Sequence, residues 1–220
     1  MTARTAPRGG GSDAGVMVVT DRRLAGERPI LEIAAAALAG GAAVIQLREK
    51  DLGGAALLEL AAALVAAAKP RPRVRILVND RLDVAMAAHA HGVHLPAAGL
   101  PIAAARAKSP ARFLVGRSVH GLAEAREAAK AGADYLVCGP VFATPSKAGF
   151  GDPIGPEVLR KTAEAVRLPV WAIGGITPEN APTLRGLPIA GVAVIGAVMT
   201  AADPAAAVAA LRAGLGAGVD

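Results

Sequence analysis

Polar side chains, charged side chains and glycines follow short apolar runs at regular intervals along the 220 residues. Arginine and lysine could neutralise phosphate groups, an aspartate could hold a divalent cation, and glycine amides could approach an anion closely. The residues at these points are Gln46, Arg48, Lys50, Asn79, Asp80, His94, Ser118, His120, Thr144, Ser146, Lys147, Gly175, Ile195 and Gly196. This combination predicts a site for small phosphorylated molecules.

Three cations from separate segments could together neutralise a highly charged group such as a diphosphate. They are Arg48, Lys50 and Lys147. Asp80 could hold Mg²⁺ against that group, because magnesium commonly uses one or two carboxylates and completes its shell with phosphate oxygens and water. A diphosphate bridged by Mg²⁺ is a leaving group. A helix cap or a solvated charge is the alternative for Asp80 taken alone.

A second anion site is expected where glycines follow the last two apolar runs. Gly174, Gly175 and Gly196 would let backbone amides approach a phosphate, and a helix starting at Thr177 would add a favourable dipole. Two anionic groups imply two substrates or one long substrate.

The apolar runs that precede these residues predict eight strands. They span residues 16–20, 43–47, 74–78, 92–95, 113–118, 135–138, 170–173 and 192–195. Helical spacing appears between them, as at residues 30–39, 55–68, 122–131, 155–166 and 204–213. Parallel strands need crossover helices, and strands that are apolar throughout are covered on both faces. The sequence therefore predicts an α/β protein, a single-domain (β/α)8 TIM barrel whose active face lies at the strand carboxyl ends. An open doubly wound sheet is the alternative, although no Gly-x-Gly-x-x-Gly opens a helix after the first strand.

Composition excludes several other classes of protein. Hydrophobic residues make up 53% of the chain and charged residues 19%, so it is too apolar to be disordered. The single cysteine allows no internal disulfide and no zinc cluster. The charge-free run at residues 186–202 contains a proline and falls short of a bilayer span. We expect residues 1–15 to form a flexible tail without a secretory signal, residues 16–220 to form the barrel domain, and the protein to be cytoplasmic.

The chain is basic, with 24 Lys and Arg against 18 Asp and Glu and a net charge of +6. Such a balance attracts anions of any kind. Only 2% of the residues are aromatic, which leaves little surface for stacking on bases. We therefore expect small phosphorylated substrates as partners, with no nucleic acid and no membrane. An exterior this rich in alanine is compatible with a homodimer.

The same residues carry a resemblance to a known family. Its motifs are Thr20–Arg22 (TDR), Gln46–Lys50 (QLREK), Asn79–Arg81 (NDR), Gly92–Leu95 (GVHL), Gly116–His120 (GRSVH), Gly139–Lys147 (GPVFATPSK), Ala172–Ile176 (AIGGI) and Val192–Ile195 (VAVI). In this order, from about Val16 to the last helix, they resemble the thiamin phosphate synthase family. One branch of that family joins an aminopyrimidine methyl diphosphate to a thiazole phosphate. The other branch, the thiazole tautomerases, isomerises the carboxylated thiazole phosphate beforehand.

The resemblance implies a mechanism and a set of site residues. In a synthase, the Mg²⁺-bound diphosphate leaves first, the aminopyrimidine ring stabilises the methylene cation, and the thiazole nitrogen attacks it. Matching positions assign the diphosphate to Arg48, Lys50, Asn79 and Lys147, the Mg²⁺ cofactor to Asp80, the pyrimidine to Gln46, His94 and Ser118, and the thiazole phosphate to Thr144, Ser146, Gly175, Ile195 and Gly196. The expected catalytic residues are Arg48, Lys50, Ser118, His120 and Lys147.

The chain departs from the synthase pattern at one metal ligand. Synthases usually carry a second magnesium carboxylate where this chain has Gly99, so Mg²⁺ would depend on Asp80, water and the diphosphate. The tautomerase branch resembles the chain there and in Gly116–His120, whose histidine would move the proton. The retained Lys50 and the pair Asn79–Asp80 favour the synthase. A tautomerase and a non-catalytic barrel that binds a phosphorylated ligand are the alternatives.

Overall fold

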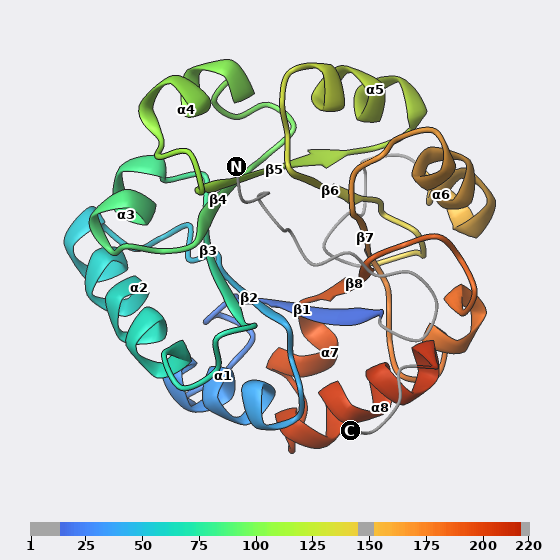
Figure 1. Cartoon of the computed structure of the whole chain (residues 1–220). Coiled ribbons are helices and arrows are strands. Elements are labelled where there is room, and N and C mark those ends of the chain that lie inside the picture. The colour runs from blue at the N-terminus through green and yellow to red at the C-terminus, as the bar shows by residue number, and fades with distance from the viewer. Residues whose placement is uncertain (1–13, 145–151, 217–220) are drawn as a thin grey trace.

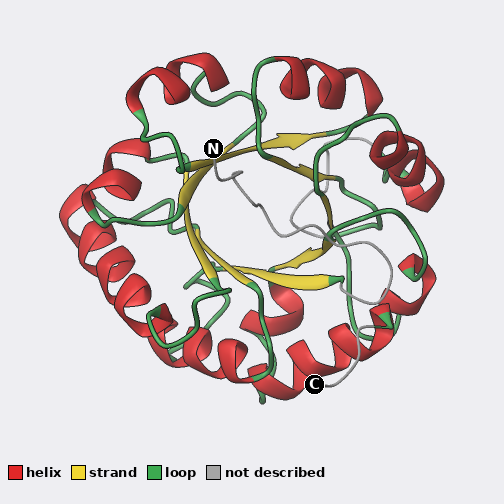
Figure 2. Ribbon diagram, in the orientation of Figure 1, coloured by secondary structure: helices red, strands yellow, loops and turns green. Residues whose placement is uncertain are grey.

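The strands form a closed parallel barrel surrounded by helices, as Figure 1 and Figure 2 show. The computed structural model of the chain describes residues 14–144 and 152–216. Its strands are β1 (Gly15–Val19), β2 (Val44–Leu47), β3 (Arg75–Asn79), β4 (Gly92–Leu95), β5 (Leu114–Val119), β6 (Tyr135–Cys138), β7 (Val170–Ile173) and β8 (Gly191–Val194). Their order around the barrel follows the chain, and β1 pairs with β8. The predicted single-domain (β/α)8 TIM barrel is therefore confirmed.

The helices lie on the outside of the barrel. They are α1 (Ile30–Ala39), α2 (Gly54–Ala68), α3 (Leu82–Ala87), α4 (Ile102–Lys108), α5 (Leu122–Lys130), α6 (Gly155–Glu164), α7 (Gly196–Met199) and α8 (Pro204–Leu215). Local sequence marks both ends of α8. Asp203 caps its amino end by accepting a hydrogen bond from the Ala206 amide at 3.0 Å. Gly216 ends the helix in the left-handed conformation that glycine adopts without strain.

Two apolar layers stabilise the barrel. Inside the strands, a buried cluster that includes Met17, Leu77, Tyr135 and Trp171 fills the interior. Outside the strands, a larger aliphatic cluster lies between the sheet and the helices. Both faces of the strands are therefore covered, which explains why the strand sequences are apolar throughout rather than alternating. Because the interior is filled by side chains, a ligand can approach only at an end of the barrel.

The connection between β7 and β8 differs from the prediction. We expected a helix starting at Thr177, but this segment forms a turn followed by a short 3-10 helix, η2 (Ala181–Leu184). Pro182 explains the difference, because it would fall in the interior of such a helix, where proline lacks the amide hydrogen and disfavours the helical conformation of the residue before it. The dipole of a full helix is therefore not present at Thr177.

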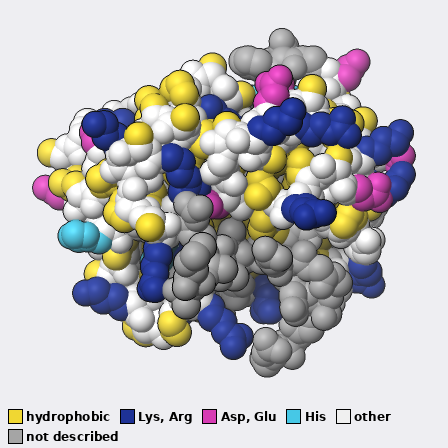
Figure 3. Space-filling model, turned by 45° about the horizontal axis from the view of Figure 1, so that its top comes forward, with side chains coloured by type: hydrophobic (Ala, Val, Ile, Leu, Met, Phe, Trp, Pro, Cys, Tyr) yellow, Lys and Arg dark blue, Asp and Glu magenta, His cyan; other side chains and the backbone are white. Residues whose placement is uncertain are grey.

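Basic side chains are scattered over the face of the molecule that Figure 3 shows. On the face shown in Figure 3, Lys and Arg side chains alternate with apolar and uncharged surface. Within the described ranges, no helix has both the length and the apolar character that crossing a bilayer requires.

Candidate functional site

All eight strands run in the same direction, so their carboxyl ends form one rim of the barrel. Hydrogen bonds between neighbouring strand ends hold the predicted site residues together. The Asp80 amide donates to the His94 carbonyl oxygen at 2.8 Å, and the Thr20 amide donates to the Gln46 carbonyl oxygen at 3.0 Å. Arg48 follows Gln46 at the end of β2. These residues are therefore neighbours at one end of the fold.

Four of the described residues assigned to the pyrimidine or the diphosphate lie near this rim. Gln46 and His94 are buried, whereas Asn79 and Ser118 are partly exposed. Asn79, the last residue of β3, lies opposite His94 in the strand register. The Gln46 amide group donates to the Met17 sulfur at 3.5 Å, which orients it inside the barrel. The fold thus places side chains expected to bind the pyrimidine beside side chains expected to bind the diphosphate.

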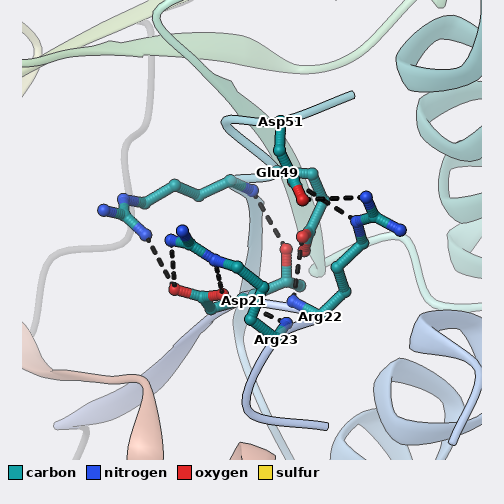
Figure 4. A network of polar contacts seen from close by, with 7 residues as sticks. Asp21, Arg22, Arg23, Glu49 and Asp51 are labelled. Carbon is teal, nitrogen blue, oxygen red and sulfur yellow. Dashed lines mark hydrogen bonds and ion pairs between the residues drawn. The ribbon is translucent and has the colours of Figure 1, made fainter. Parts of the chain in front are cut away.

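Arg48 is held by the segment after β1, whose residues Asp21, Arg22 and Arg23 are labelled in Figure 4. Its amide donates to the Thr20 hydroxyl oxygen at 3.0 Å, and its guanidinium lies 3.4 Å from the Asp21 carboxylate. Arg23 pairs with the same carboxylate at 3.2 Å. Asp21 therefore lies between two arginines, and an anionic substrate would compete with Asp21 for Arg48.

Glu49 is a buried carboxylate that the sequence analysis did not single out. Its Oε2 accepts a hydrogen bond from the Arg22 amide at 2.9 Å, whereas its Oε1 is buried without a hydrogen-bond partner. Burial raises the pKa of Glu49. Asp51 pairs with the Arg22 side chain at 2.8 Å. Glu49 and Asp51 thus connect the end of β2 to the end of β1 and fix the backbone around Arg48. In the sequence, only their position in and beside the QLREK motif indicates that Glu49 and Asp51 belong to the site.

A second missed residue, Tyr135, lies below Ser118 in the barrel interior. His94 contacts both: its Nε2 lies 2.8 Å from the Ser118 hydroxyl and its Nδ1 lies 3.2 Å from the Tyr135 hydroxyl. Gly116 pairs with Tyr135 in the strand register, and a Cβ at Gly116 would overlap the tyrosine ring. Glycine at this position therefore makes room for the tyrosine beside the histidine.

Asp80 is the carboxylate that the sequence predicts to hold Mg²⁺. It is exposed and adopts a left-handed backbone, with a φ of 65°. A Cβ built at Gly99 would lie 3.1 Å from Asp80 Oδ1, so a side chain at position 99 would stand directly beside Asp80. The described residues contain no group of three His, Cys, Asp or Glu side chains that could hold a metal. One carboxylate fits Mg²⁺ only if diphosphate oxygens and water supply the remaining ligands, which is how magnesium commonly binds.

The segment after β7 contains the expected glycine turn. Gly174 and Gly175 have φ values of 101° and 64°, and side chains there would collide with the segment after β6. Asn180 braces this turn: its side chain donates to the Gly175 carbonyl oxygen at 2.7 Å and accepts from the Thr177 amide at 2.9 Å. Asn180 was not predicted as a site residue. Gly196, which opens α7, offers an amide that has no partner within the helix.

The remaining predicted residues are placed as follows. Thr144, after β6, is partly exposed, and Ile195 precedes α7. Lys50 is exposed beside the Arg48 segment. Ser146 and Lys147 lie outside the described residues.

His120 lies just beyond the end of β5, and its side chain is 42% exposed. Its Nδ1 lies 3.1 Å from Glu124 Oε2, and its amide donates to the same oxygen at 2.9 Å. Glu124 stands in the first turn of α5, where a carboxylate that accepts an upstream amide is typical of a helix cap. The structure therefore gives this pair a structural role besides any role in proton transfer.

Comparison with known proteins identifies the family of the chain. A family model described as thiamine monophosphate synthase matches residues 16–198. The chain belongs to this family. The thiamine-phosphate synthase of Roseiflexus castenholzii is 47% identical over 197 residues, which cover 89% of this chain and 86% of the relative. The thiamine-phosphate synthase of Moorella thermoacetica is 45% identical over 195 residues, which cover 89% and 92%.

A solved structure supports the same family assignment. Thiamine phosphate pyrophosphorylase from Pyrococcus furiosus superposes with a TM-score of 0.84 at 40% sequence identity, covering 93% of this chain and 96% of that protein. The matched family segment begins within β1 and ends within α7. It therefore includes the carboxyl ends of all eight strands.

Proposed function

We propose that the chain is a thiamine-phosphate synthase, which joins an aminopyrimidine methyl diphosphate to a thiazole phosphate and releases diphosphate. Family membership supports this reaction. The observation that supports it is that three groups of residues with different chemistry lie at one rim: Arg48 with Asp80, His94 with Ser118, and the turns at Gly175 and Gly196. A reaction between two phosphorylated molecules requires this arrangement.

The chain's own residues would perform three tasks in this reaction. Arg48 and Lys50 would bind the diphosphate and stabilise the charge that develops as it leaves. His94 and Ser118 would hold the aminopyrimidine ring in place while the methylene cation forms. The amides of Gly175 and Gly196 would bind the thiazole phosphate. When bound through Asp80, Mg²⁺ would neutralise the diphosphate and make it a better leaving group.

Thiazole tautomerisation is the second candidate, and the His120–Glu124 contact favours it. With Glu124 bonded to Nδ1, the other ring nitrogen of His120 would be left to remove and return a proton. The exposed Asp80 and Lys50 have no task in that reaction, because its substrate carries no diphosphate.

One pair of variants tests the synthase. The purified protein is given both substrates with Mg²⁺, and diphosphate release and thiamin phosphate are measured. We expect turnover in the wild type and about a hundredfold loss in Asp80→Asn, because a group that stabilises a leaving anion contributes on the order of 10² in rate. Asp83→Asn is the matched control, since Asp83 pairs with Arg81 at 2.6 Å on the neighbouring helix α3.

The other candidates give different outcomes. Metal-independent exchange of a thiazole proton with deuterated water that is lost in His120→Ala would show that the protein is a tautomerase and not a synthase. Binding of a phosphorylated ligand without either reaction would leave a non-catalytic barrel. We further propose that the protein works as a cytoplasmic enzyme, because its single cysteine, Cys138, is a buried free thiol suited to a reducing compartment.

A further inference from the structure

Inside the barrel, a tyrosine, a histidine and a serine from three neighbouring strands form one hydrogen-bonded row. The row is Tyr135 on β6, His94 on β4 and Ser118 on β5, joined by the 3.2 Å and 2.8 Å contacts of the histidine ring. Tyr135 and His94 are almost completely buried, at 2% and 3% exposure, whereas Ser118 is partly exposed. The row therefore leads from the closed interior to a hydroxyl that a ligand can reach.

Burial fixes the protonation states along this row. It raises the pKa of Tyr135 well above its ordinary value, so the phenol keeps its hydrogen. It lowers the pKa of His94 to about 3, so the imidazole is neutral near pH 7. A neutral imidazole donates from one ring nitrogen and accepts at the other. The hydrogens of the row can therefore all point toward Ser118 or all point toward Tyr135.

The available acceptors select one direction. Among the described residues, His94 is the only hydrogen-bond partner of the Tyr135 hydroxyl. If His94 Nδ1 donated to Tyr135, the phenolic hydrogen would be buried without an acceptor, at a cost of about 1–3 kcal/mol. If Tyr135 donates to Nδ1, then Nε2–H donates to Ser118 Oγ, and both buried hydrogens are satisfied. The hydrogen of the Ser118 hydroxyl is then left to point away from the row.

We propose that Tyr135 is a positioning residue that holds His94 in its Nε2–H form and thereby makes the Ser118 hydroxyl a hydrogen-bond donor to the substrate. A donor at this point suits a heteroaromatic ring nitrogen with a lone pair, as an aminopyrimidine presents. This role rests on the proposed synthase function, in which Ser118 faces the pyrimidine. A neutral row also keeps positive charge away from a ring that must stabilise a methylene cation.

The first test removes one oxygen atom with Tyr135→Phe. We expect the KM for the aminopyrimidine diphosphate to rise about tenfold, which corresponds to one lost hydrogen bond of about 1.4 kcal/mol. The KM for the thiazole phosphate should stay within about twofold. The matched control is Trp171→Phe, which trims another buried aromatic of the same interior cluster. A rise in KM for both substrates in Tyr135→Phe, or the same selective rise in Trp171→Phe, would overturn the proposal.

A double-mutant cycle tests whether Tyr135 acts through Ser118. In the Ser118→Ala background, Tyr135→Phe should no longer change the KM for the aminopyrimidine substrate, because the hydroxyl that it orients is gone. If the effects of Tyr135→Phe and Ser118→Ala on this KM were fully additive, Tyr135 would not act through Ser118 and the proposal would be refuted.

Nitrogen-15 NMR of the His94 ring measures the direction of the row without any substrate. We expect a protonated Nε2 and an unprotonated Nδ1 in the wild type. A protonated Nδ1 would contradict the proposal even if the synthase reaction is confirmed. If the wild type does not turn over the two substrates, the proposed function fails, and the NMR result still decides the direction of the hydrogen bonds.

Discussion

Restoring a second carboxylate beside Asp80 should strengthen divalent-cation binding, but only when Pro96 is also changed. A Cβ at Gly99 would lie 3.1 Å from Asp80 Oδ1, which is the right neighbourhood for a shared cation. The same Cβ would lie 2.8 Å from Pro96 Cδ and 3.1 Å from the Pro96 carbonyl oxygen. The single variant Gly99→Asp therefore forces the loop to shift, whereas Pro96→Gly/Gly99→Asp removes the proline ring that blocks the new side chain.

The expected gain in cation affinity follows from the exposure of Asp80 to water. Two unit charges about 4 Å apart interact by about 1 kcal/mol in water, and Asp80 is exposed, so the water value applies. A divalent cation doubles this attraction to about 2 kcal/mol, or roughly a thirtyfold increase in affinity. Without metal, the two carboxylates repel each other, so the double variant should be less stable by about 1 kcal/mol. Added cation should reverse that loss.

Titration calorimetry with Mg²⁺ in the presence of inorganic diphosphate measures the affinity, and thermal unfolding with and without the cation measures the stability. The matched control is Pro96→Gly/Gly99→Asn, which has the same shape without the charge. Equal cation affinity in the aspartate and asparagine variants would refute the reasoning, because it would show that position 99 does not face the cation bound at Asp80.

Three further predictions concern the interior and the turn after β7. Gly116→Ala should lower the unfolding free energy by about 1–3 kcal/mol in denaturant titrations, since its Cβ would overlap the Tyr135 ring; an unchanged midpoint would show that the ring can move aside. Asn180→Ala should raise the KM for the thiazole phosphate about tenfold and leave the other KM unchanged, because it releases the turn at Gly175; equal effects on both would argue for general loosening. Because burial lowers the pKa of His94 from 6.5 to about 3, the unfolded chain binds a proton that the folded protein refuses. The unfolding free energy should therefore fall as the pH is lowered from 6.5 towards 3, and His94→Gln should flatten that slope.

The strands were predictable because the residues that form each strand are adjacent in the sequence. A parallel strand buried on both faces needs a short aliphatic run, and each predicted run lies within one or two residues of an observed strand, as at 92–95 and 135–138. Polar residues at the carboxyl ends then had to share one rim. The helix expected to start at Thr177 was a wrong prediction, although Pro182 in the interior of that segment argues against it.

The contacts inside the rim were not predictable, because they depend on the register around the barrel. Tyr135 and His94 are 41 residues apart in sequence, and nothing local indicates that their rings meet. Glutamate is usually a surface residue. Glu49 is buried only because β1 packs against β2. The pairing of Arg48 with Asp21 has the same origin. Long-range contacts of this kind are set by tertiary structure.

The pairing of β1 with β8 has a consequence for how the protein is made. During synthesis, β1 emerges first and has no second neighbour until β8 follows it near the end of the chain. Until then the nascent sheet has two open edges, which are sites of aggregation. The ring therefore closes only after β8 has been synthesised, and a product cut short before β8 should be insoluble rather than merely inactive.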